Sequence, residues 1–409
     1  MYDVIVIGAG AAGLMAAGTA AKNGQSVLIL EKKSRPAIKL SITGKGRCNV
    51  TNSAELKEFI SRFGNNGKFL YGAFNKFFNT DTINFFEELG VKCRLERGGR
   101  YFPESNDACD IVNALIKFVK NNNAKILANC TVEKFITEDK KIKEVILKDG
   151  RKFLAKKFIL ATGGKSYPLT GSDGSGYVLA ENLGHTVIKP SPALVPLVSD
   201  DKLIKQLNKL KLKNIEITVL ADNIEKKKLF GEIEFTNFGL TGPLILTVSS
   251  FVYELLDKKH NVEISINFKP ALDDKQLDDR LIRELNNFGK LPIKNMLKTL
   301  LPLQMTDVFM KKNNIKLTES CSSVNKEKRK KIFDGLRSMK FRITSTRPIE
   351  EAIVTKGGVS LNEVDQKTMK SKIIDNLYFC GEILDIDGPT GGFNLQAAFS
   401  TGFVAGINF

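Results

Sequence analysis

Residues 3–24, "DVIVIGAGAAGLMAAGTAAKNG", combine a short apolar run, a glycine turn and an alanine-rich helical pattern. The run at 3–7 is mostly β-branched, which is typical of a strand buried on both faces of a parallel sheet. A second apolar run, "SVLILEK" at 26–32, follows the helical pattern. Strand, glycine turn, helix and strand in this order predict a βαβ unit that binds a dinucleotide.

The three glycines of the turn have different predicted tasks. Gly8 makes the tight turn, Gly10 lets the backbone approach a pyrophosphate, and Gly13 lets the helix pack close to the strand. The helix N-terminus then presents unpaired N–H groups to the anion. Glu31, at the end of the second strand, is placed to bind ribose hydroxyls. An ordinary structural glycine turn is the alternative, but the strand, the helix and the acid together favour a dinucleotide.

Two further glycine segments favour FAD over NAD. One is "ATGG" at 161–164, which ends a predicted strand. The other is "GEILDIDGPTGGFNLQAAFSTG" at 381–402, where Asp385 and Asp387 can accept hydrogen bonds from ribityl or ribose hydroxyls. The glycine pair at 391–392 opens a helix whose N-terminal amides can face the flavin pyrimidine and stabilise the anionic reduced flavin. The alternative for this segment is a plain Asp-Gly turn before a helix.

The length of the chain and its cysteines limit the classes of protein to which it can belong. A chain of 409 residues divides into two or three domains and does not need disulfides for stability. Its six cysteines form no CxxC pair, and its two histidines, His185 and His260, offer no zinc spacing. The strand pattern begins directly after the first residues, without a signal-like leader, and no apolar run reaches membrane-spanning length. We therefore expect a cytoplasmic protein with reduced thiols, no metal and no membrane anchor.

The charge suggests a polyanionic partner. The chain carries 62 Lys and Arg against 45 Asp and Glu, a formal net charge of +17. Residues 290–342 alone hold 14 basic and 4 acidic residues, a net of +10. Nucleic acid is a plausible partner for such a segment. The alternative is that a lysine-rich composition merely solvates helix faces.

The order of patterns predicts an α/β nucleotide-binding domain built from both chain ends, residues 1–190 and 345–409. Three prolines in "KPSPALVPL" (189–197) are expected to break regular structure at a domain crossing. Alternating strands then predict an inserted, β-barrel-like domain at 191–271, completed by residues near 341–357. A small, basic helical insertion is expected at 272–340.

Five segments together resemble one family. They are "SITGKGRCNVTN" (41–52), "ATGGKSYPLTGSDGSGYVLAENLGHTV" (161–187), "GEIEFTNFGLTGP" (231–243), "EAIVTKGGV" (351–359) and "NLYFCGEILDIDGPTGGFNLQAAFSTG" (376–402). This set is similar to the BaiN/RdsA (YhiN-like) flavoproteins, formerly described as aminoacetone oxidase-like. The resemblance spans essentially the whole chain. It implies a Rossmann-like FAD domain, an inserted β domain, a helical insertion, and NAD(P)H as the reductant.

The resemblance also implies an activity and a binding set. Members are linked to reduction of a uridine in large-subunit ribosomal RNA (23S) to dihydrouridine, and more loosely to redox steps on bile-acid rings. No separate nicotinamide-binding motif is visible, so NAD(P)H is expected to visit the flavin face transiently. The implied cofactor-binding residues are Gly8, Gly10, Ala12, Gly13, Glu31, Lys32, Gly46, Arg47, Val132, Ala161, Thr162, Gly163, Gly381, Glu382, Asp387, Gly392, Asn394 and Leu395.

Residues 43–49 are expected to form a flexible loop against the flavin. There Arg47 could clamp a phosphate or stabilise an enolate-like oxygen. Uracil reduction needs a hydride at C6 and a proton at C5, so the Cys48 thiol is a candidate donor, although a free cysteine is more often a small buried hydrophobe. Asn237 stands where related sequences commonly have histidine, which puts an acid or base role there in doubt. Arg47, Cys48 and Asn237 are the predicted catalytic residues.

The basic segment supplies the predicted RNA contacts through phosphate groups. They are Lys326, Lys328, Arg329, Lys330, Lys331 and Arg337. A base inside folded RNA would have to leave its stack, possibly against Tyr167, Phe238 or Phe393, each of which could instead be a packing residue. The leading hypothesis is a ribosomal RNA dihydrouridine synthase. The alternatives are a reductase of a small apolar ring substrate and an RNA-binding flavoprotein without turnover. The sequence leaves the oligomeric state open.

Overall fold

The computed structural model describes residues 1–408, which form two compact units. Unit 1 combines residues 1–193 with the C-terminal segment that begins at Ile349, and unit 2 comprises Leu194–Pro348. Each unit has its own cluster of buried apolar side chains. The expected fold class, an α/β domain made from both chain ends plus an inserted β domain and helices, is confirmed.

Unit 1 is built on a seven-stranded sheet of order β6-β2-β1-β9-β8-β7, with β19 paired to the far side of β9. The pairs β6–β2, β2–β1, β1–β9 and β9–β19 are parallel, whereas β7, β8 and β9 form an antiparallel meander. The strands are β1 (Tyr2–Ile7), β2 (Val27–Leu30), β6 (Lys125–Leu127), β7 (Val132–Glu138), β8 (Lys141–Leu147), β9 (Lys152–Leu160) and β19 (Leu377–Phe379). Parallel strands at the centre of this sheet are buried, as the apolar run at 3–7 predicts.

Helices and two small sheets complete unit 1. The helices are α1 (Ala11–Lys22), α2 (Ile38–Ser41), α3 (Thr43–Gly46), α4 (Leu56–Ser61), α5 (Tyr71–Phe74), α6 (Asn79–Glu88), α7 (Ala108–Asn121), α8 (Ser175–Asn182) and α14 (Phe393–Ile407). The small sheets are β3 (Thr51–Asn52), β5 (Arg100–Pro103) and β4 (Cys93–Glu96), and β10 (Val187–Ala193) with β18 (Val354–Val359). Short 3₁₀ turns in this unit are η1 (Gly64–Leu70), η2 (Pro168–Thr170), η5 (Ile349–Glu351), η6 (Leu361–Glu363) and η7 (Gly381–Ile383).

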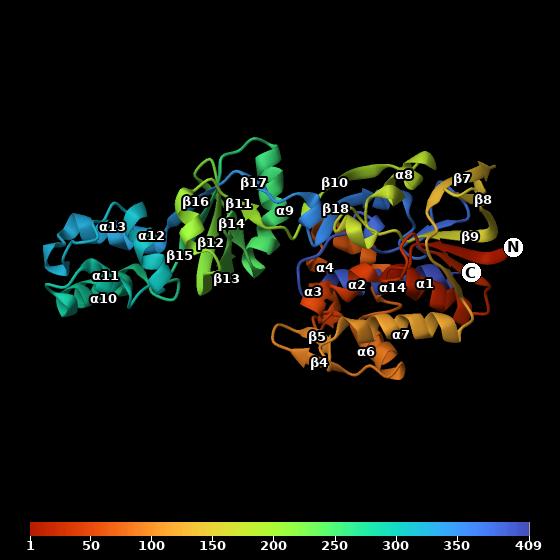
Figure 1. Cartoon of the computed structure of the whole chain (residues 1–409), viewed down its shortest axis with the longest axis horizontal. Helices are drawn as coiled ribbons and strands as arrows, with labels where there is room; N and C mark the ends of the chain where they lie inside the picture. Colours follow the sequence, from red (N-terminus) through yellow and green to blue (C-terminus); the bar gives the residue numbers. More distant parts are fainter. Residues whose placement is uncertain (409) are drawn as a thin grey trace. The chain divides into compact units, whose positions relative to one another are not determined.

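The close contact of α1 with α14 joins the two ends of the chain (Figure 1). Gly402 lies against the backbone of α1, where an added Cβ would be 2.5 Å from the Ala12 carbonyl oxygen. One turn later, a Cβ at Gly406 would be 2.5 Å from the Ala16 carbonyl oxygen. Because both positions are glycine, the two helix backbones can approach more closely than any side chain would permit.

The expectation that the prolines of 189–197 break regular structure is wrong for the first part of that segment. Pro190 and Pro192 lie inside β10, which pairs antiparallel with β18. The register shifts between Ile188 and Ser191, so the strand carries an irregularity at Pro190. Proline lacks an N–H donor, and it is accommodated in a strand at such irregularities and at sheet edges.

Unit 2 contains an antiparallel sheet of order β16-β15-β12-β13-β14-β11-β17. Its strands are β11 (Leu197–Val198), β12 (Lys211–Ala221), β13 (Ile224–Phe235), β14 (Gly239–Thr241), β15 (Val262–Asn267), β16 (Met339–Ile343) and β17 (Ser345–Thr346). The two end strands, β16 and β17, are separated by one residue in sequence. The sheet must therefore curl back on itself, which is the barrel-like form that the alternating strands predicted.

The helices of unit 2 share one core with this sheet. Figure 1 shows α10 to α13 gathered beside β15 and β16, while α9 contacts β13. The helices are α9 (Pro243–Asp257), α10 (Asp274–Phe288), α11 (Ile293–Leu297), α12 (Leu303–Lys312) and α13 (Lys326–Arg337), with 3₁₀ turns η3 (Lys202–Leu207) and η4 (Cys321–Ser323). These helices are amphipathic: α10, for example, buries Leu277, Leu281 and Leu285 at helical spacing.

Replacing Gly402 by alanine tests the glycine contact between α1 and α14. In an isolated helix this change would be stabilising by about 1 kcal/mol. Here the new methyl would meet the Ala12 carbonyl, so we expect a loss of about 1–3 kcal/mol in the free energy of unfolding. Chemical denaturation measures it. Lys117→Ala, on the exposed side of α7, is the control and should leave stability nearly unchanged. Stabilisation by Gly402→Ala would contradict the close approach.

Candidate functional site

The N-terminal glycine turn forms a cradle at the end of β1. A Cβ on Gly8 would lie 2.6 Å from the Ala161 carbonyl oxygen, and one on Gly13 would lie 2.0 Å from the Gly8 carbonyl oxygen. Gly10, the residue that begins α1, has no atom within 4 Å of its Cβ direction. Two glycines therefore close the turn, and the third faces open space at a helix N-terminus. An anionic diphosphate fits there, because the first N–H groups of a helix have no partner within the helix.

Glu31 lies beside this cradle and is 8% exposed. One carboxylate oxygen accepts a hydrogen bond from the Ala9 N–H at 2.7 Å, and the other accepts from the Lys33 N–H at 2.8 Å. These bonds fix the turn, yet each oxygen keeps a lone pair for a ribose hydroxyl. Lys32 points elsewhere, since its ammonium pairs with Asp173 at 2.6 Å.

The segment before β7 runs next to Glu31. The Glu31 N–H donates to the Leu127 carbonyl at 2.9 Å, and the Cys130 N–H donates to the Glu31 carbonyl at 2.8 Å. Val132, the first residue of β7, is buried two residues further on. Val132 thus follows a segment that is bonded to Glu31, and its contact with a cofactor stays a prediction.

The "ATGG" segment closes the cradle from the opposite strand. The Ala161 N–H donates to the Ile7 carbonyl at 2.9 Å, which aligns the end of β9 with the end of β1. The Thr162 hydroxyl is buried, and among residues 1–408 it has no hydrogen-bond partner. Such an orphaned group is uncommon in folded proteins and is satisfied when a polar ligand lies against it. Gly163 follows in the left-handed region, with φ of +74°.

The C-terminal segment reaches the same cradle. A Cβ on Gly381 would lie 2.7 Å from the Ala12 Cβ, so this glycine packs directly on the first turn of α1. Gly392 begins α14 with φ of +95°, where a Cβ would meet the Thr51 carbonyl oxygen at 2.4 Å. Asn394 closes the intervening loop, because its side chain both accepts from the Gly388 N–H and donates to the Gly388 carbonyl at 2.8 Å.

The other members of the C-terminal set differ in their surroundings. Asp387 precedes the loop and Leu395 is half-buried against the core of unit 1. Asp385 accepts a hydrogen bond from the Asn66 side chain at 3.1 Å. Burial raises the pKa of the Asp385 carboxyl above its usual value.

Glu382 is held by three partners that the sequence did not indicate. Its carboxylate accepts from the Lys39 ammonium at 2.7 Å, the Thr355 N–H at 2.9 Å and the Ser166 hydroxyl at 3.2 Å. Lys39 also donates to Ser166 at 2.7 Å. These residues come from four distant segments, and no local motif marks them. Glu382 therefore ties the C-terminal segment to α2, to the loop after β9 and to β18.

The loop at 43–49 is irregular and anchored through its arginine. Gly44, Lys45 and Gly46 all have φ between +57° and +84°, so α3 is not a regular helix. The Arg47 guanidinium donates to Glu96 at 2.5 Å and to Asn106 at 2.8 Å. It also lies over the Phe102 ring, 4.1 Å from the ring centroid. These contacts position the loop, and they compete with the phosphate clamp predicted for Arg47.

Cys48 is fully buried at the base of that loop, with φ of +57°. Its N–H donates to the Thr43 carbonyl at 3.0 Å. Burial raises the pKa of the Cys48 thiol to about 12, and the thiol therefore keeps its proton near neutral pH. This is the protonation state a proton donor needs, while full burial is the arrangement expected of a packing residue.

The remaining predicted site residues lie in unit 2. Asn237 is exposed in the turn between β13 and β14, next to Phe238, whose ring is 4.9 Å from the Arg347 guanidinium. It belongs to unit 2, whereas the residues of the glycine cradle belong to unit 1. Its catalytic role stays a prediction.

The predicted RNA contacts lie on α13, and most of them form ion pairs. Arg329 pairs with Asp278 at 2.8 Å, and Lys328 pairs with Glu319. Lys330 and Lys331 pair along the helix, with Asp334 and Glu327, each at 3.5 Å. Lys326 makes no ion pair within residues 1–408.

Arg337 is the most enclosed of these cations. Its side chain is 17% exposed and pairs with Asp274 at 3.0 Å. It also donates to the carbonyls of Lys269 at 3.0 Å and Leu272 at 2.7 Å. These bonds fasten the end of α13 to the segment before α10, which is a structural task.

Over residues 1–408, no three or more His, Cys, Asp and Glu side chains are grouped so that they could hold a metal ion. Over the same residues, no helix combines the length and the apolar character needed to cross a membrane.

Known proteins resemble this chain over its whole length. The family model described as "HI0933-like protein Rossmann domain" matches residues 2–408. A ribosomal RNA dihydrouridine synthase of Haemophilus influenzae is 30% identical, covering 99% of this chain and 97% of that protein. A 3-dehydro-bile acid delta(4,6)-reductase of Clostridium scindens is 29% identical, covering 99% of this chain and 98% of that protein.

Solved structures share the fold at low sequence identity. A flavocytochrome c3 fumarate reductase has a TM-score of 0.53 and 16% identity, covering 99% of this chain and 77% of that chain. A 3-ketosteroid-delta4-(5alpha)-dehydrogenase of Rhodococcus jostii has a TM-score of 0.52 and 14% identity, covering 99% of this chain and 96% of that chain. These likenesses show a shared fold.

Two glycine variants separate a binding cradle from a structural turn. Gly10→Val adds its side chain in open space, so the protein should fold and lose bound flavin, because the valine occupies the diphosphate position. Gly13→Ala should lower the melting temperature, because its methyl would meet the Gly8 carbonyl oxygen. The flavin-to-protein ratio and thermal unfolding measure the two effects. Full flavin occupancy in Gly10→Val would refute the cradle.

The buried Cys48 thiol predicts an alkaline loss of stability. Its pKa rises from about 9 in the unfolded chain to about 12 when folded, so its contribution is complete below pH 9 and is lost toward pH 12. Between those values, Cys48→Ala should make the slope of unfolding free energy against pH shallower by about 1.4 kcal/mol per pH unit. Ser61→Ala, which removes no titrating group, should keep the wild-type slope. Equal slopes in all three proteins would contradict the burial of a neutral thiol.

Proposed function

The chain belongs to the HI0933-like Rossmann-domain family, and on this premise we propose that it is an NAD(P)H-driven ribosomal RNA dihydrouridine synthase. That it is an FAD-dependent oxidoreductase follows from the family and from the flavoenzymes that share its fold. The resemblance to the BaiN/RdsA flavoproteins is likewise confirmed. The substrate, its binding surface and the roles of single residues are the proposal.

The cradle of unit 1 fits FAD in chemical terms. We assign the diphosphate to Gly10 and the N-terminal amides of α1, and the adenosine ribose to Glu31. Thr162 brings a buried hydroxyl without a protein partner to the same place. Gly392 and the first amides of α14 would face the flavin ring, where a helix N-terminus favours negative charge.

The proposed reaction adds a hydride to C6 and a proton to C5 of a uracil ring. Bound FAD, once reduced by NAD(P)H, supplies the hydride. The protein must then supply the proton, and Cys48 is the proposed donor because its thiol stays protonated near neutral pH. Since Cys48 is fully buried, the loop at 43–49 has to open for the transfer.

The charge of the chain is the observation that carries the RNA proposal. A net charge of +17, with +10 in residues 290–342, exceeds what a flavin site requires. Ribosomal RNA is a polyanion whose phosphates contribute binding without sequence specificity. The relative from Haemophilus influenzae, similar over its full length, carries the name of this activity.

The structure narrows the cations we assign to RNA. Within residues 1–408, nine of the 14 basic residues in 290–342 form ion pairs, and Arg337 and Arg329 are held in several bonds each. In the same described part of the chain Lys326 makes no ion pair, and the pairs of Lys330 and Lys331 are exposed and weak. We therefore assign the main phosphate contacts of α13 to Lys326, Lys330 and Lys331.

The second candidate is reduction of a small apolar ring substrate. The bile acid reductase of Clostridium scindens is about as similar to this chain as the ribosomal RNA enzyme is. Both names denote reduction of carbon–carbon double bonds in a ring. An apolar substrate gains little from a strongly basic surface, and RNA gains much, so the charge favours RNA.

The decisive measurement is the dihydrouridine content of large-subunit ribosomal RNA in cells lacking this gene. We expect the modification to disappear on deletion and to return when the gene is restored. A gene that combines Lys326→Ala, Lys330→Ala and Lys331→Ala should restore the modification only in part. In vitro, this triple variant should bind the RNA more weakly and with a salt dependence whose log–log slope is smaller by about 2–3.

The control is a triple alanine variant at Lys117, Lys120 and Lys125, which are exposed in unit 1. It removes the same charge and should restore the modification fully. If the ribosomal RNA is unchanged by deletion, the RNA proposal fails. Oxidation of the prereduced flavin by an unsaturated ring substrate would then support the second candidate.

A further inference from the structure

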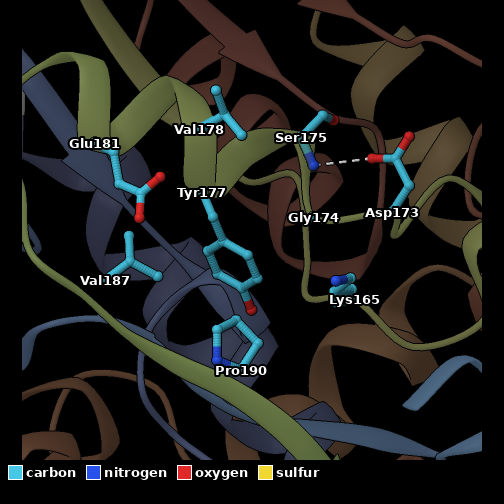
Figure 2. A pocket seen from close by; sticks show the side chains of 9 residues that line it. All are labelled: Lys165, Asp173, Gly174, Ser175, Tyr177, Val178, Glu181, Val187 and Pro190. Atoms are coloured by element: carbon cyan, nitrogen blue, oxygen red, sulfur yellow. Dashed lines mark hydrogen bonds between the residues drawn. The ribbon is translucent and has the colours of Figure 1, made fainter. Parts of the chain in front are cut away.

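A hollow of about 420 Å³ lies in unit 1 between α8, β10 and the loop that follows β9. Figure 2 shows Tyr177, Val178 and Glu181 reaching it from α8, with Val187 and Pro190 on the β10 side. The volume is in the range that proteins use for small ligands and cofactor parts. The strand irregularity at Pro190 shapes this wall.

The hollow contains two unused charges of opposite sign. Within residues 1–408, neither the Lys165 ammonium nor the Glu181 carboxylate has a hydrogen bond or an ion pair. The third charged residue, Asp173, is already paired with Lys32 and accepts a bond from the Ser175 N–H. A ligand can therefore recruit one cation and one carboxylate at no loss of existing pairs.

The remaining lining suits a flat apolar ring. Val178 is 55% exposed, an unusual position for a valine that no other part of the described chain covers. Val187 and Pro190 lie on the side of β10, and the Tyr177 ring borders Pro190 (Figure 2). A heteroaromatic ring between such side chains gains dispersion and hydrophobic stabilisation.

The hollow adjoins the flavin cradle. The Tyr177 hydroxyl lies 3.5 Å from the Glu382 carbonyl oxygen, to which it donates. On the other side, Gly176 packs so tightly on Thr162 that a Cβ there would be 1.8 Å from the threonine hydroxyl oxygen. Helix α8 thus has the hollow along one side and the cradle along the other. The hollow and the cradle thus share helix α8 as a common wall.

We propose that this hollow binds the adenosine diphosphate part of a nicotinamide dinucleotide, and that it selects NADH over NADPH. The inference rests on the proposed function in requiring a reduced nicotinamide as the electron source. The adenine lies between Val178, Val187 and Pro190, and Glu181 accepts hydrogen bonds from the ribose 2′ and 3′ hydroxyls. Lys165 pairs with the diphosphate.

The selectivity follows from the sign of the charge at Glu181. A carboxylate is the usual acceptor for a ribose diol in NAD sites, whereas a 2′-phosphate requires a cation such as arginine. In NADPH the 2′-phosphate would lie against the Glu181 carboxylate, and like charges repel. The nicotinamide gives up one hydride, two electrons and a proton, to the flavin, and leaves as NAD⁺.

An RNA strand is a poorer occupant. With Asp173 already paired to Lys32, the hollow offers the single ammonium of Lys165, which can pair with one diphosphate but not with a chain of phosphates. A dinucleotide with one diol and one diphosphate matches one free carboxylate and one free ammonium.

Binding of ADP-ribose and of its 2′-phosphate to the flavin-loaded protein tests the site without turnover. Isothermal titration should give an affinity for ADP-ribose at least about tenfold higher than for the 2′-phosphate. Glu181→Gln should weaken the binding of ADP-ribose by about tenfold. Glu181→Lys should bind the 2′-phosphate more tightly than ADP-ribose. Glu88→Gln, an exposed carboxylate on α6, is the matched control and should bind as wild type.

Flavin reduction then links the hollow to turnover. Stopped-flow reduction by NADH should show a higher apparent Kd in Glu181→Gln, with the flavin content unchanged. When the flavin is instead reduced by dithionite, the wild type and Glu181→Gln should form dihydrouridine at the same rate, because chemical reduction does not need a dinucleotide in the hollow. Equal ADP-ribose affinities in wild type, Glu181→Gln and Glu181→Lys would overturn the site.

The two proposals fail in different ways. The reduced protein could make no dihydrouridine while the Glu181 variants still change the preference between NADH and NADPH. This result would refute the RNA function and support the dinucleotide site. If NADPH binds and reduces the flavin as well as NADH does, the selectivity of the hollow is refuted, whatever the substrate.

Discussion

The cofactor cradle depends on backbone segments that meet where no Cβ is present. Gly8 packs on Ala161, Gly13 on Gly8, Gly381 on Ala12, and Gly402 on the α1 backbone. At each contact a single methyl group would come closer than atoms can approach. Because those contacts bring the ends of β1, β9 and β19 together, the open side at Gly10 is left as the place for a diphosphate. Thr162 and Glu382, which follow β9 and β19, owe their positions to this convergence.

Local patterns predict the cradle well because its chemistry is local. The glycine turn, the acid after the second strand and the "ATGG" and "DGPTGG" segments each carry their geometry in a few neighbouring residues. The bonds that hold Glu382 are different: Lys39, Ser166 and Thr355 come from separate segments, and nothing in their neighbours distinguishes them. The same holds for Arg47, whose partners Glu96 and Asn106 are far away in sequence. The prolines of 189–197 led to a wrong prediction at β10, because the irregularity in that strand accommodates Pro190.

The number of lysines and arginines in the sequence exceeds the number of cations that are free to bind a partner. The segment at 290–342 looks like a uniform basic patch in sequence, yet most of its cations are shared with acids of the same unit. Arg337 shows why the sequence could not reveal this, since its acceptors are backbone carbonyls before α10. Net charge still sets the long-range field of the molecule, and the individual pairs decide which side chains are left for short-range contacts.

The packing of α14 on α1 has a consequence for the order of events during synthesis. A ribosome adds roughly 5–20 residues per second, so the first βαβ unit and all of unit 2 leave it well before α14 is made. Until then the α1 face that receives Gly402 and Gly406 is uncovered, and the proposed flavin site lacks helix α14. During that interval the uncovered apolar face of α1 is exposed, and the nascent chain must avoid aggregating through it. Under the proposed placement of the flavin, its site is complete only after the last helix has been made.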